Sequence, residues 1–271
     1  EYGGMPNDPN LQLSASTSLS MSKITSTTAA SRCGNGSVTL EATAVNGTVY
    51  WYDSLTTTTP IETGNSYSTP TLTSTTTYYV DAGCINERKS IIATINPIPD
   101  YPQIGANSTS PVSYCQNDNA IPLEAIASTN CILNWYTVAT GGTPSASNPT
   151  PSTTTLGSTS YFVSQTNTIT GCEGSRAEII VTVNPIPIAP SVKDISYCLD
   201  ATTNPLTATA STNCTLNWYN SATGGNSTTI SPTPSSTTAG TTQYYVSQTN
   251  NDSCESPRSE ISVRVNTIPL A

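Results

Sequence analysis

Cysteine is the reactive side chain that this sequence supplies most clearly, because the 271 residues include eight cysteines and no histidine. Without an imidazole, neither a Ser-His-Asp triad nor a Cys-His pair can form. The cysteines also lack the tight Cys-x-x-Cys spacing that is typical of zinc and redox sites. Eight cysteines in an acidic, Thr-rich chain therefore favour disulfide chemistry in an extracellular setting, at the cell surface or secreted.

Carboxylates are the other groups that could do chemistry. Glu173 and Glu178 flank Arg176, and the same pattern recurs around Arg258. The preferred interpretation is a surface ion pair on the last strand of a sheet, worth under about 1 kcal/mol. A glycosidase would need a deep cleft, for which small domains leave little room. We therefore predict that the chain is not an enzyme and holds no cofactor and no metal.

The charge of the chain argues against nucleic acid as a partner, and its apolar pattern argues against insertion into a membrane. The formal net charge is −9, and the eight Lys and Arg residues are scattered apart from one adjacent pair. Nucleic-acid binding needs clustered basic side chains to neutralise phosphates. No run of 18 apolar residues occurs, so we expect no direct membrane insertion. The predicted partners are neither nucleic acid nor the bilayer.

The sequence contains copies of one module. The phrase NCILNWYTVATGG at 130–142 returns as NCTLNWYNSATGG at 213–225, an offset of 83 residues. A more divergent copy upstream has the same Trp-Tyr pair, beginning at Trp51, and in every copy an arginine lies four residues after a cysteine. Self-similarity at a fixed period indicates a tandem array.

Proline-rich segments mark the joints between the copies. NPIPDYP occupies 96–102 and NPIPIAP occupies 184–190, and linkers of this kind act as semi-rigid spacers. The expected organisation is an unassigned N-terminal extension at 1–26, followed by repeats at 27–99, 100–187 and 188–271.

Within one copy the apolar residues alternate with a period of two, as in ILNWYTV at 132–138 and AEIIVTV at 177–183. Clusters of Gly, Pro, Ser and Thr separate these segments, as expected for turns between strands. Roughly seven short strands in about 80 residues, with a Trp on the third, are typical of an immunoglobulin-like sandwich. The predicted fold is all-β: a tandem array of three immunoglobulin-like β-sandwich domains joined by short Pro-rich linkers.

Each copy places a Trp-Tyr pair on its third strand. Successive side chains of a strand point to opposite faces, so one ring of each pair should lie in the core and the other outside. The expected core aromatics are Trp51, Trp135 and Trp218. The outer rings, candidates for stacking on a sugar ligand, are Tyr52, Tyr136 and Tyr219. Weak sites repeated along one chain can gain avidity if they bind together.

The preferred disulfide scheme uses the two cysteines that all copies share and bridges them inside each copy. Its pairs are Cys33–Cys84, Cys115–Cys172 and Cys198–Cys254. Each bond would close a loop of more than 50 residues, worth roughly 3–4 kcal/mol in the chain-entropy model. Cys131 and Cys214 would remain as extra thiols, buried or linked to another chain.

Geometry raises an objection to this scheme. In an immunoglobulin-like sandwich the two shared positions lie at opposite ends, whereas bridging requires Cα atoms within about 7 Å. A second scheme joins Cys131 to Cys172 and Cys214 to Cys254, which lie at the same end. A third scheme bridges neighbouring domains, since the bottom of one abuts the top of the next.

Two copies carry a longer shared pattern: Tyr-Cys, Leu-x-Ala, Trp-Tyr-x-x-Ala-x-Gly-Gly, Pro-Thr-Pro-Ser-x-Thr, Tyr-x-Val-Ser-Gln-Thr and Cys-Glu. This pattern resembles the immunoglobulin-like repeats of large Bacteroidota surface proteins, which include gliding-motility adhesins and other cargo of the type IX secretion system. The resemblance covers about residues 27–271, with the first copy matching in outline. It implies tandem arrays at the cell surface with adhesive or stalk roles, and it supplies no catalytic residues.

One further motif resembles a modification site of the same bacteria. Asp53-Ser54-Leu55 looks like their O-glycosylation motif, so Ser54 is a predicted acceptor. The predicted function is a non-catalytic structural or adhesive segment, a stalk or fibre, whose partners are polysaccharide or another surface protein, with self-association through edge strands. The alternatives are a carbohydrate-binding module array and an accessory region of a larger secreted hydrolase.

Overall fold

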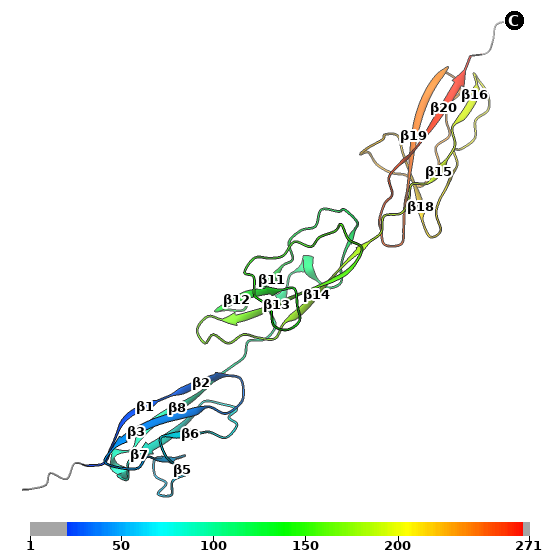
Figure 1. Ribbon diagram of the computed structural model, residues 1–271. Helices are drawn as coiled ribbons and strands as arrows, with labels where there is room; N and C mark the ends of the chain where they lie inside the picture. Colours follow the sequence, from blue (N-terminus) through cyan, green and yellow to red (C-terminus); the bar gives the residue numbers. More distant parts are fainter. Residues whose placement is uncertain (1–20, 268–271) are drawn as a thin grey trace, which may run out of the picture. The chain divides into compact units, whose positions relative to one another are not determined.

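The structure is a computed structural model that describes residues 21–267. It is all-β, as predicted, and its strands form three groups that follow one another along the chain, β1 to β8, β9 to β14 and β15 to β20 (Figure 1). Helical geometry within 21–267 is confined to two short 3-10 turns, Ile85–Glu87 and Ala106–Ser108. Of the expected N-terminal extension at 1–26, residues 1–20 lie outside the described residues.

Repeat 1 is a sandwich of a three-stranded and a five-stranded sheet. The smaller sheet has the order β1-β3-β6, with bounds Lys23–Thr28, Thr39–Val45 and Ser66–Ser68. The larger sheet has the order β2-β8-β7-β4-β5, with bounds Ala30–Cys33, Lys89–Asn96, Thr76–Asp81, Tyr50–Tyr52 and Glu62–Thr63. The first strand of the sandwich thus divides between both sheets, and its second half, β2, runs parallel to β8.

The boundary at residue 27 is too late for the start of repeat 1. Ile24 in β1 is 3% exposed and belongs to the core, and β1 pairs antiparallel with β3. Ile24 is the single apolar residue of the segment KITSTT, so no alternation marks it as a strand. The pairing with β3 supplies what the sequence pattern does not show.

Repeats 2 and 3 share one topology, each with a four-stranded and a two-stranded sheet. In repeat 2 the order is β10-β14-β13-β12, with bounds Val112–Cys115, Ala177–Asn184, Gly157–Asn167 and Cys131–Tyr136, and β9 (Gln103–Ile104) pairs with β11 (Ala125–Ile126). In repeat 3 the order is β16-β20-β19-β18, with bounds Ile195–Cys198, Ser259–Asn266, Gly240–Thr249 and Thr215–Tyr219, and β15 (Ser191–Val192) pairs with β17 (Ala208–Thr209).

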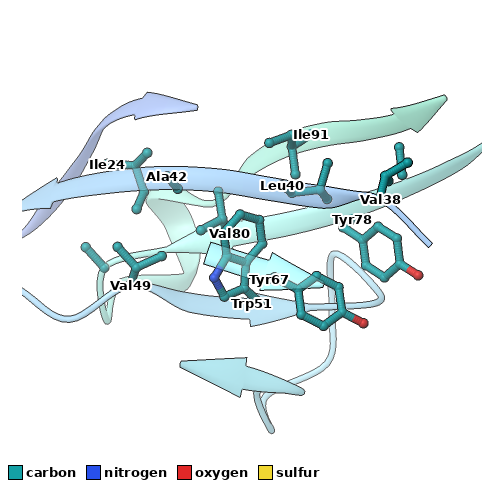
Figure 2. Packing of buried hydrophobic residues seen from close by; sticks show 12 residues of the cluster. Ile24, Val38, Leu40, Ala42, Val49, Trp51, Tyr67, Tyr78, Val80 and Ile91 are labelled. Carbon is teal, nitrogen blue, oxygen red and sulfur yellow. The ribbon is translucent and has the colours of Figure 1, made fainter. Parts of the chain in front are cut away.

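Each repeat has its own core built around its tryptophan, and Trp51, Trp135 and Trp218 are 0%, 2% and 3% exposed. Repeat 1 has the more aromatic core: Trp51 stacks on Tyr67 at 5.7 Å between ring centroids, and Tyr67 meets Tyr78 edge-on at 5.2 Å (Figure 2). Burial, and then the neighbouring Tyr78, raise the pKa of Tyr67 to about 12. The smaller cores of repeats 2 and 3 are aliphatic around the tryptophan, with Leu, Val and Ile.

The chain divides into two compact units. One comprises the residues up to Pro99 together with Asn167–Gly174, and the other comprises Asp100–Thr166 and the residues from Ser175 onward. Asn167–Gly174 is the loop of repeat 2 between β13 and β14, so this loop groups with repeat 1 rather than with its own repeat. Cys172, which lies in this loop, forms a disulfide with Cys33 of repeat 1.

Candidate functional site

Two disulfide bonds join consecutive repeats. Cys33 of repeat 1 bonds to Cys172 in the β13–β14 loop of repeat 2, and Cys115 of repeat 2 bonds to Cys254 in the β19–β20 loop of repeat 3. Each bond has a Cα–Cα distance of 5.5 Å and spans 139 residues. The free thiols are Cys84, Cys131, Cys198 and Cys214.

The preferred pairing inside each copy is therefore wrong, and Cys84 and Cys198, assigned to disulfides from the sequence, are free. Strand register explains why. Cys115 pairs in register with Asn184, the last residue of β14, whereas Cys172 precedes the first residue of β14. A strand of eight residues spans about 26 Å, far beyond the roughly 7 Å that a disulfide allows. The scheme that bridges neighbouring domains is the one the structure contains.

The strand cysteine occupies the same position in all three repeats. It ends the strand that runs parallel to the last strand of the repeat, opposite the terminal asparagine of that last strand. The register pairs are Cys33↔Asn96, Cys115↔Asn184 and Cys198↔Asn266. The next backbone N–H donates to the carbonyl of that asparagine at 2.8 to 2.9 Å in every repeat. The backbone around the strand cysteine therefore has the same hydrogen bonding and register in all three repeats.

The loop cysteine is held by an asparagine turn. In repeat 3, Asn250 Oδ1 accepts hydrogen bonds from the N–H groups of Asp252 and Cys254, at 3.0 and 2.9 Å. The N–H of Asn167 in repeat 2 donates to the carbonyl of Cys172 at 2.9 Å, and the equivalent bond in repeat 3 joins Asn250 to Cys254. Side-chain turns of this kind fix loops that lack sheet pairing. Both bonded loop cysteines are fully buried.

A buried glutamine ties the preceding linker to the same end of the repeat. Gln165 Nε2 donates to the carbonyl of Asp100 at 2.8 Å, and its Oε1 accepts from the N–H of Ser128 at 2.7 Å. In repeat 3, Gln248 makes the equivalent bonds to Ile188 and Ser211. Both glutamines are 0% exposed. This linker clamp was not predicted, although its signal is visible in the sequence: Ser-Gln-Thr occurs in repeats 2 and 3, and Ala82 replaces the glutamine in repeat 1.

The predicted stacking tyrosines are not exposed. Tyr52, Tyr136 and Tyr219 are only 6%, 6% and 7% exposed. An arginine guanidinium covers each ring, with Cζ 3.2 to 3.5 Å from the ring centroid. The covering residues are Arg88, Arg176 and Arg258. Alternation does place the Tyr on the face opposite to the Trp, but that face is closed by the arginine, so these rings are not available to stack on a sugar.

The arginines of repeats 2 and 3 stack on the tyrosine and hold the turn that follows the Trp-Tyr strand. Arg176 Nη1 donates to the carbonyl of Val138 at 2.7 Å, and Arg258 Nη1 donates to the carbonyl of Ser221 at 2.6 Å. A planar guanidinium can stack on an aromatic face while its edge donates hydrogen bonds. One side chain therefore joins the last strand, the tyrosine and the turn.

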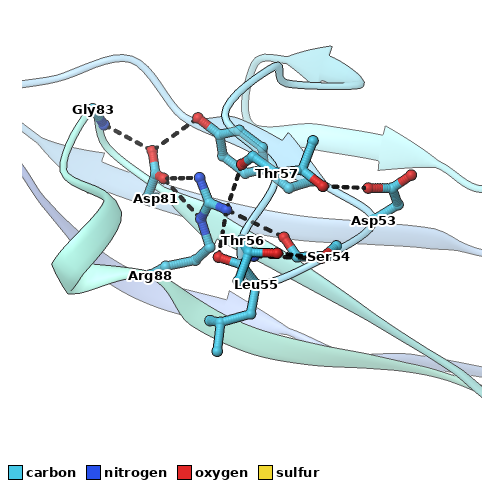
Figure 3. Close-up of polar contacts among 9 residues, drawn as sticks. Asp53, Ser54, Leu55, Thr56, Thr57, Asp81, Gly83 and Arg88 are labelled. Atoms are coloured by element: carbon cyan, nitrogen blue, oxygen red, sulfur yellow. Dashed lines mark hydrogen bonds and ion pairs between the residues drawn. The ribbon is translucent and has the colours of Figure 1, made fainter.

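Repeat 1 adds a buried carboxylate to this arrangement. Arg88 donates from Nε and Nη2 to Asp81 Oδ2 at 3.0 and 2.9 Å, and both side chains are only 2% exposed (Figure 3). Arg88 Nη1 also donates to the carbonyls of Leu55 and Thr57. Burial, and then the negative charge of Asp81, raise the pKa of Tyr52.

Repeat 3 positions its carboxylate differently. Glu255, directly after the loop cysteine, accepts hydrogen bonds from the hydroxyls of Tyr219 and Ser247. Ser247 occupies in β19 the place that Asp81 occupies in β7, because each follows the central valine of the strand. The carboxylate near the Arg-Tyr stack therefore comes from a strand in repeat 1 and from a loop in repeat 3, while the stack itself is the same.

Ser54 lies in the turn held by Arg88, half-buried, and its carbonyl accepts a hydrogen bond from Arg88 Nη1 at 3.2 Å. Its hydroxyl lies 3.3 Å from the hydroxyl of Thr56. O-glycosylation of Ser54 stays a prediction. Beside this turn is a hollow of about 410 Å³, lined by Tyr50, Pro60 and Ile85 among others. Repeat 2 has a hollow of about 270 Å³ lined by Trp135, Tyr161 and Pro149 among others.

In the described part of the chain, no group of three or more His, Cys, Asp or Glu residues is arranged to hold a metal ion. No helix within 21–267 is both long and apolar enough to span a bilayer.

The repeats match a family of known domains. The sequence model for the Ig-like domain described as CHU_C associated matches residues 21–97, 99–185 and 187–267. The chain belongs to this family. The three matches cover most of the sequence, and they show a tandem array of immunoglobulin-like domains, as predicted from the strands. A search of curated protein sequences gives no significant match.

Solved structures give similar multidomain chains at low identity. A titin I-band fragment, I67–I69, is 11% identical with a TM-score of 0.39, and the match covers 92% of this chain and 99% of that one. Three N-terminal domains of the bacteriophage RB49 outer capsid protein Hoc are also 11% identical, with a TM-score of 0.37 and coverage of 92% and 99%. Fibronectin(III)-like modules of Clostridium thermocellum CbhA are 15% identical, with a TM-score of 0.36 and coverage of 59% and 93%. The fold assignment depends on the family match and on the strand order.

Tandem immunoglobulin-like domains with disulfides indicate an extracellular or secreted protein, because disulfides persist in oxidising compartments. Immunoglobulin-like repeat domains are typically non-catalytic, and a tandem array of them is consistent with a structural or adhesive segment.

Proposed function

We propose that this chain is a load-bearing segment, a stalk or fibre, of a bacterial surface adhesin. The observation that carries the proposal is the overlap of the two disulfides, because the loop closed by Cys33 and Cys172 contains Cys115, and the loop closed by Cys115 and Cys254 contains Cys172. A force applied to the two ends therefore acts on a path that is cross-linked from repeat to repeat.

The overlap limits how far the chain can extend even when its repeats unfold. With both bonds intact, the shortest covalent path runs from Glu1 to Cys33, back from Cys172 to Cys115, and from Cys254 to Ala271. These stretches contain about 110 residues, and an extended residue contributes about 3.5 Å, so the taut length is about 385 Å. The reduced chain of 271 residues would reach about 950 Å at the same rise.

Single-molecule pulling between the termini tests this role. The oxidised chain should stop extending at less than half the length of the reduced chain. The matched control is the variant Cys33→Ser, Cys115→Ser, which should extend fully without a reductant. Equal final lengths for oxidised and reduced wild-type chains would contradict the load-bearing role.

The resemblance of the repeats to those of Bacteroidota surface proteins supports a finer proposal. The large surface proteins of Bacteroidota, including gliding-motility adhesins and cargo of the type IX secretion system, use immunoglobulin-like arrays of this kind. We place this chain among them, at the cell surface, with polysaccharide or another surface protein as partner of the whole molecule and with lateral self-association through edge strands. Detection of the parent protein on intact cells, and its loss from the surface when type IX export is blocked, tests that placement.

A carbohydrate-binding role is the second candidate, and the hollow on the Trp-Tyr face favours it. The hollow of repeat 1 is lined by Tyr50 and Pro60, and a separate hollow of repeat 2 is lined by Tyr161 and Pro149; each of them includes the tyrosine of the Trp-Tyr strand. Retention of the chain on a polysaccharide column should then fall with Tyr50→Ala and remain with Tyr101→Ala, which removes an exposed tyrosine outside the hollow. No retention of the wild-type chain would leave the spacer role alone.

A further inference from the structure

Cys198 has the geometry of a bonded cysteine but carries no bond. It is an exposed free thiol in the structure, at the strand position that Cys33 and Cys115 occupy in repeats 1 and 2. Its register partner is the terminal asparagine of the last strand, as for the other two. The following N–H donates to that asparagine at 2.9 Å, as in the bonded copies. Repeat 3 thus presents its thiol in the same way as the two repeats that are cross-linked.

We propose that Cys198 is a docking cysteine, and that its partner is the loop cysteine of a further repeat of the Ser-Gln-Thr type. The bond forms by thiol–disulfide exchange: the two thiols lose two protons and two electrons, and a small disulfide such as oxidised glutathione is reduced to two thiols. The product would repeat the links that already connect repeat 1 to repeat 2 and repeat 2 to repeat 3. This inference does not depend on the mechanical role proposed above.

The type of partner is set by what surrounds the two bonded loop cysteines. Each bonded loop belongs to a repeat whose buried glutamine fixes the preceding linker, through Gln165 Nε2 to Asp100 in repeat 2 and Gln248 Nε2 to Ile188 in repeat 3. Holding the linker pre-positions the loop thiol against the repeat before it. Such pre-organisation lowers the entropy lost when the bond forms.

Repeat 1 lacks the features that a receiving repeat has. Ala82 replaces the glutamine, and three residues separate Val80 from Cys84, whereas eight separate Val163 from Cys172. The loop of repeat 1 is folded instead into the 3-10 turn Ile85–Glu87. A second copy of this chain, approaching through repeat 1, is therefore a poor partner for Cys198, and a Ser-Gln-Thr repeat is the fitting one.

The test extends the full chain by one repeat. A copy of residues 190–271 is joined after Ala271, which places the added loop cysteine 138 residues beyond Cys198, close to the 139 of the existing bonds. The protein is refolded in a glutathione redox buffer, free thiols are alkylated, and the disulfides are mapped by mass spectrometry. The expected result is loss of the Cys198 thiol and a new bond to the added loop cysteine.

Two matched extensions make the test decisive. A copy of repeat 2, residues 100–187, should also capture Cys198, so misfolding of one insert does not decide the outcome. A copy of repeat 1, residues 21–99, should leave Cys198 free, because its loop is short and has no glutamine. If Cys198 is fully alkylated in both chains extended by a Ser-Gln-Thr repeat, the proposal is overturned. If the copy of repeat 1 captures Cys198 as completely as the other two copies, the proposed specificity is overturned.

The role of the glutamine that holds the linker is tested in the chain without an added repeat. Gln248→Ala should lower the equilibrium constant for forming the Cys115–Cys254 bond against glutathione by about tenfold, because buried backbone groups lose their partner. Gln243→Ala removes an exposed glutamine from the same strand and is the control. An unchanged constant in Gln248→Ala would show that the clamp does not select the partner.

Discussion

Repeat 1 and repeat 3 share the same strand framework but differ in the carboxylate near the arginine and in the bonding of the strand cysteine. Both stack an arginine on a buried tyrosine, but repeat 1 balances the arginine with a buried aspartate from the strand, whereas the carboxylate of repeat 3 comes from the loop. Both end their parallel strand in a cysteine, yet Cys33 is bonded and Cys198 is free. The arginine, the tyrosine and the strand cysteine therefore have the same positions in both repeats, whereas the source of the carboxylate and the bonding of the cysteine differ.

The largest expected effect separates the two strand cysteines. Cys33→Ser removes a bond that closes 139 residues, and the chain-entropy model gives about 5 kcal/mol when both bridged repeats unfold together. Cys198→Ser removes a free thiol, and its free energy of unfolding should change by less than about 0.5 kcal/mol. Guanidinium unfolding without a reductant measures both. Equal effects would mean that Cys33 and Cys172 do not form the bond in solution.

The second prediction compares the arginines that stack on the buried tyrosines of repeats 1 and 3. Arg88→Ala leaves the buried carboxylate of Asp81 without its counter-charge, which should cost about 3–5 kcal/mol. Arg258→Ala loses a ring contact and a turn hydrogen bond, while Glu255 keeps two hydroxyl donors, so about 1–2 kcal/mol is expected. Urea unfolding of each variant gives the values.

A rescue variant sharpens that comparison. Asp81→Ser gives repeat 1 the serine that repeat 3 has at the same place, and in this background the cost of Arg88→Ala should fall toward that of Arg258→Ala. If the cost stays the same, Asp81 is not the reason that the two clamps differ.

The third prediction concerns alkaline pH and repeat 1 alone. The pKa of Tyr67 is raised from 10.0 to about 12, so the folded repeat keeps a proton that the unfolded chain loses between these values. Stability should therefore be unaffected by this group below pH 10 and decrease as pH rises from 10 to about 12. Tyr67→Phe should flatten this decrease, as measured by thermal unfolding at a series of pH values. Tyr101→Phe, which alters an exposed ring, should leave the decrease in place.

The smallest expected difference lies between two core tryptophans. Trp51 Nε1 donates to the carbonyl of Gly64 at 2.8 Å, whereas Trp135 Nε1 is buried and donates to no group within the described residues. Trp51→Phe should therefore cost about 1 kcal/mol more than Trp135→Phe, since only the first leaves a carbonyl without its donor. Far-ultraviolet circular dichroism during urea unfolding measures both costs. An equal cost would show that Trp135 Nε1 has a partner in solution.

Local patterns in the sequence were sufficient for the fold and its core. Alternation with a period of two identified the strand of Trp135 and the last strand at 177–183, because each buries one face of a sheet. It failed for β1, where Ile24 is the single apolar residue and pairing with β3 determines the structure. The offset of 83 residues identified repeats 2 and 3, and the shared Trp-Tyr pair and the Cys-to-Arg spacing identified repeat 1, without any knowledge of packing.

The candidate site was predicted less well, because its contacts are not local. The Arg four residues after each loop cysteine was visible, but not that it would cover Tyr136 from the far side of a turn. The glutamine of Ser-Gln-Thr was also visible, but its role depends on a linker 60 or 65 residues away in sequence. Two signals favoured the correct pairing: the objection that the two shared cysteines lie at opposite ends of one sandwich, and the equal spacing of 139 residues between Cys33 and Cys172 and between Cys115 and Cys254.

By itself, the sequence determined an all-β array of three repeats with a tryptophan core in each, because strand periodicity and repetition are written in neighbouring residues. Only the tertiary structure decided the disulfides and the state of the tyrosines. A bond requires two Cα atoms within a few ångströms, and an eight-residue strand keeps the cysteines of one repeat apart. Burial of a ring depends on which side chain closes over it, and that arginine arrives from another strand.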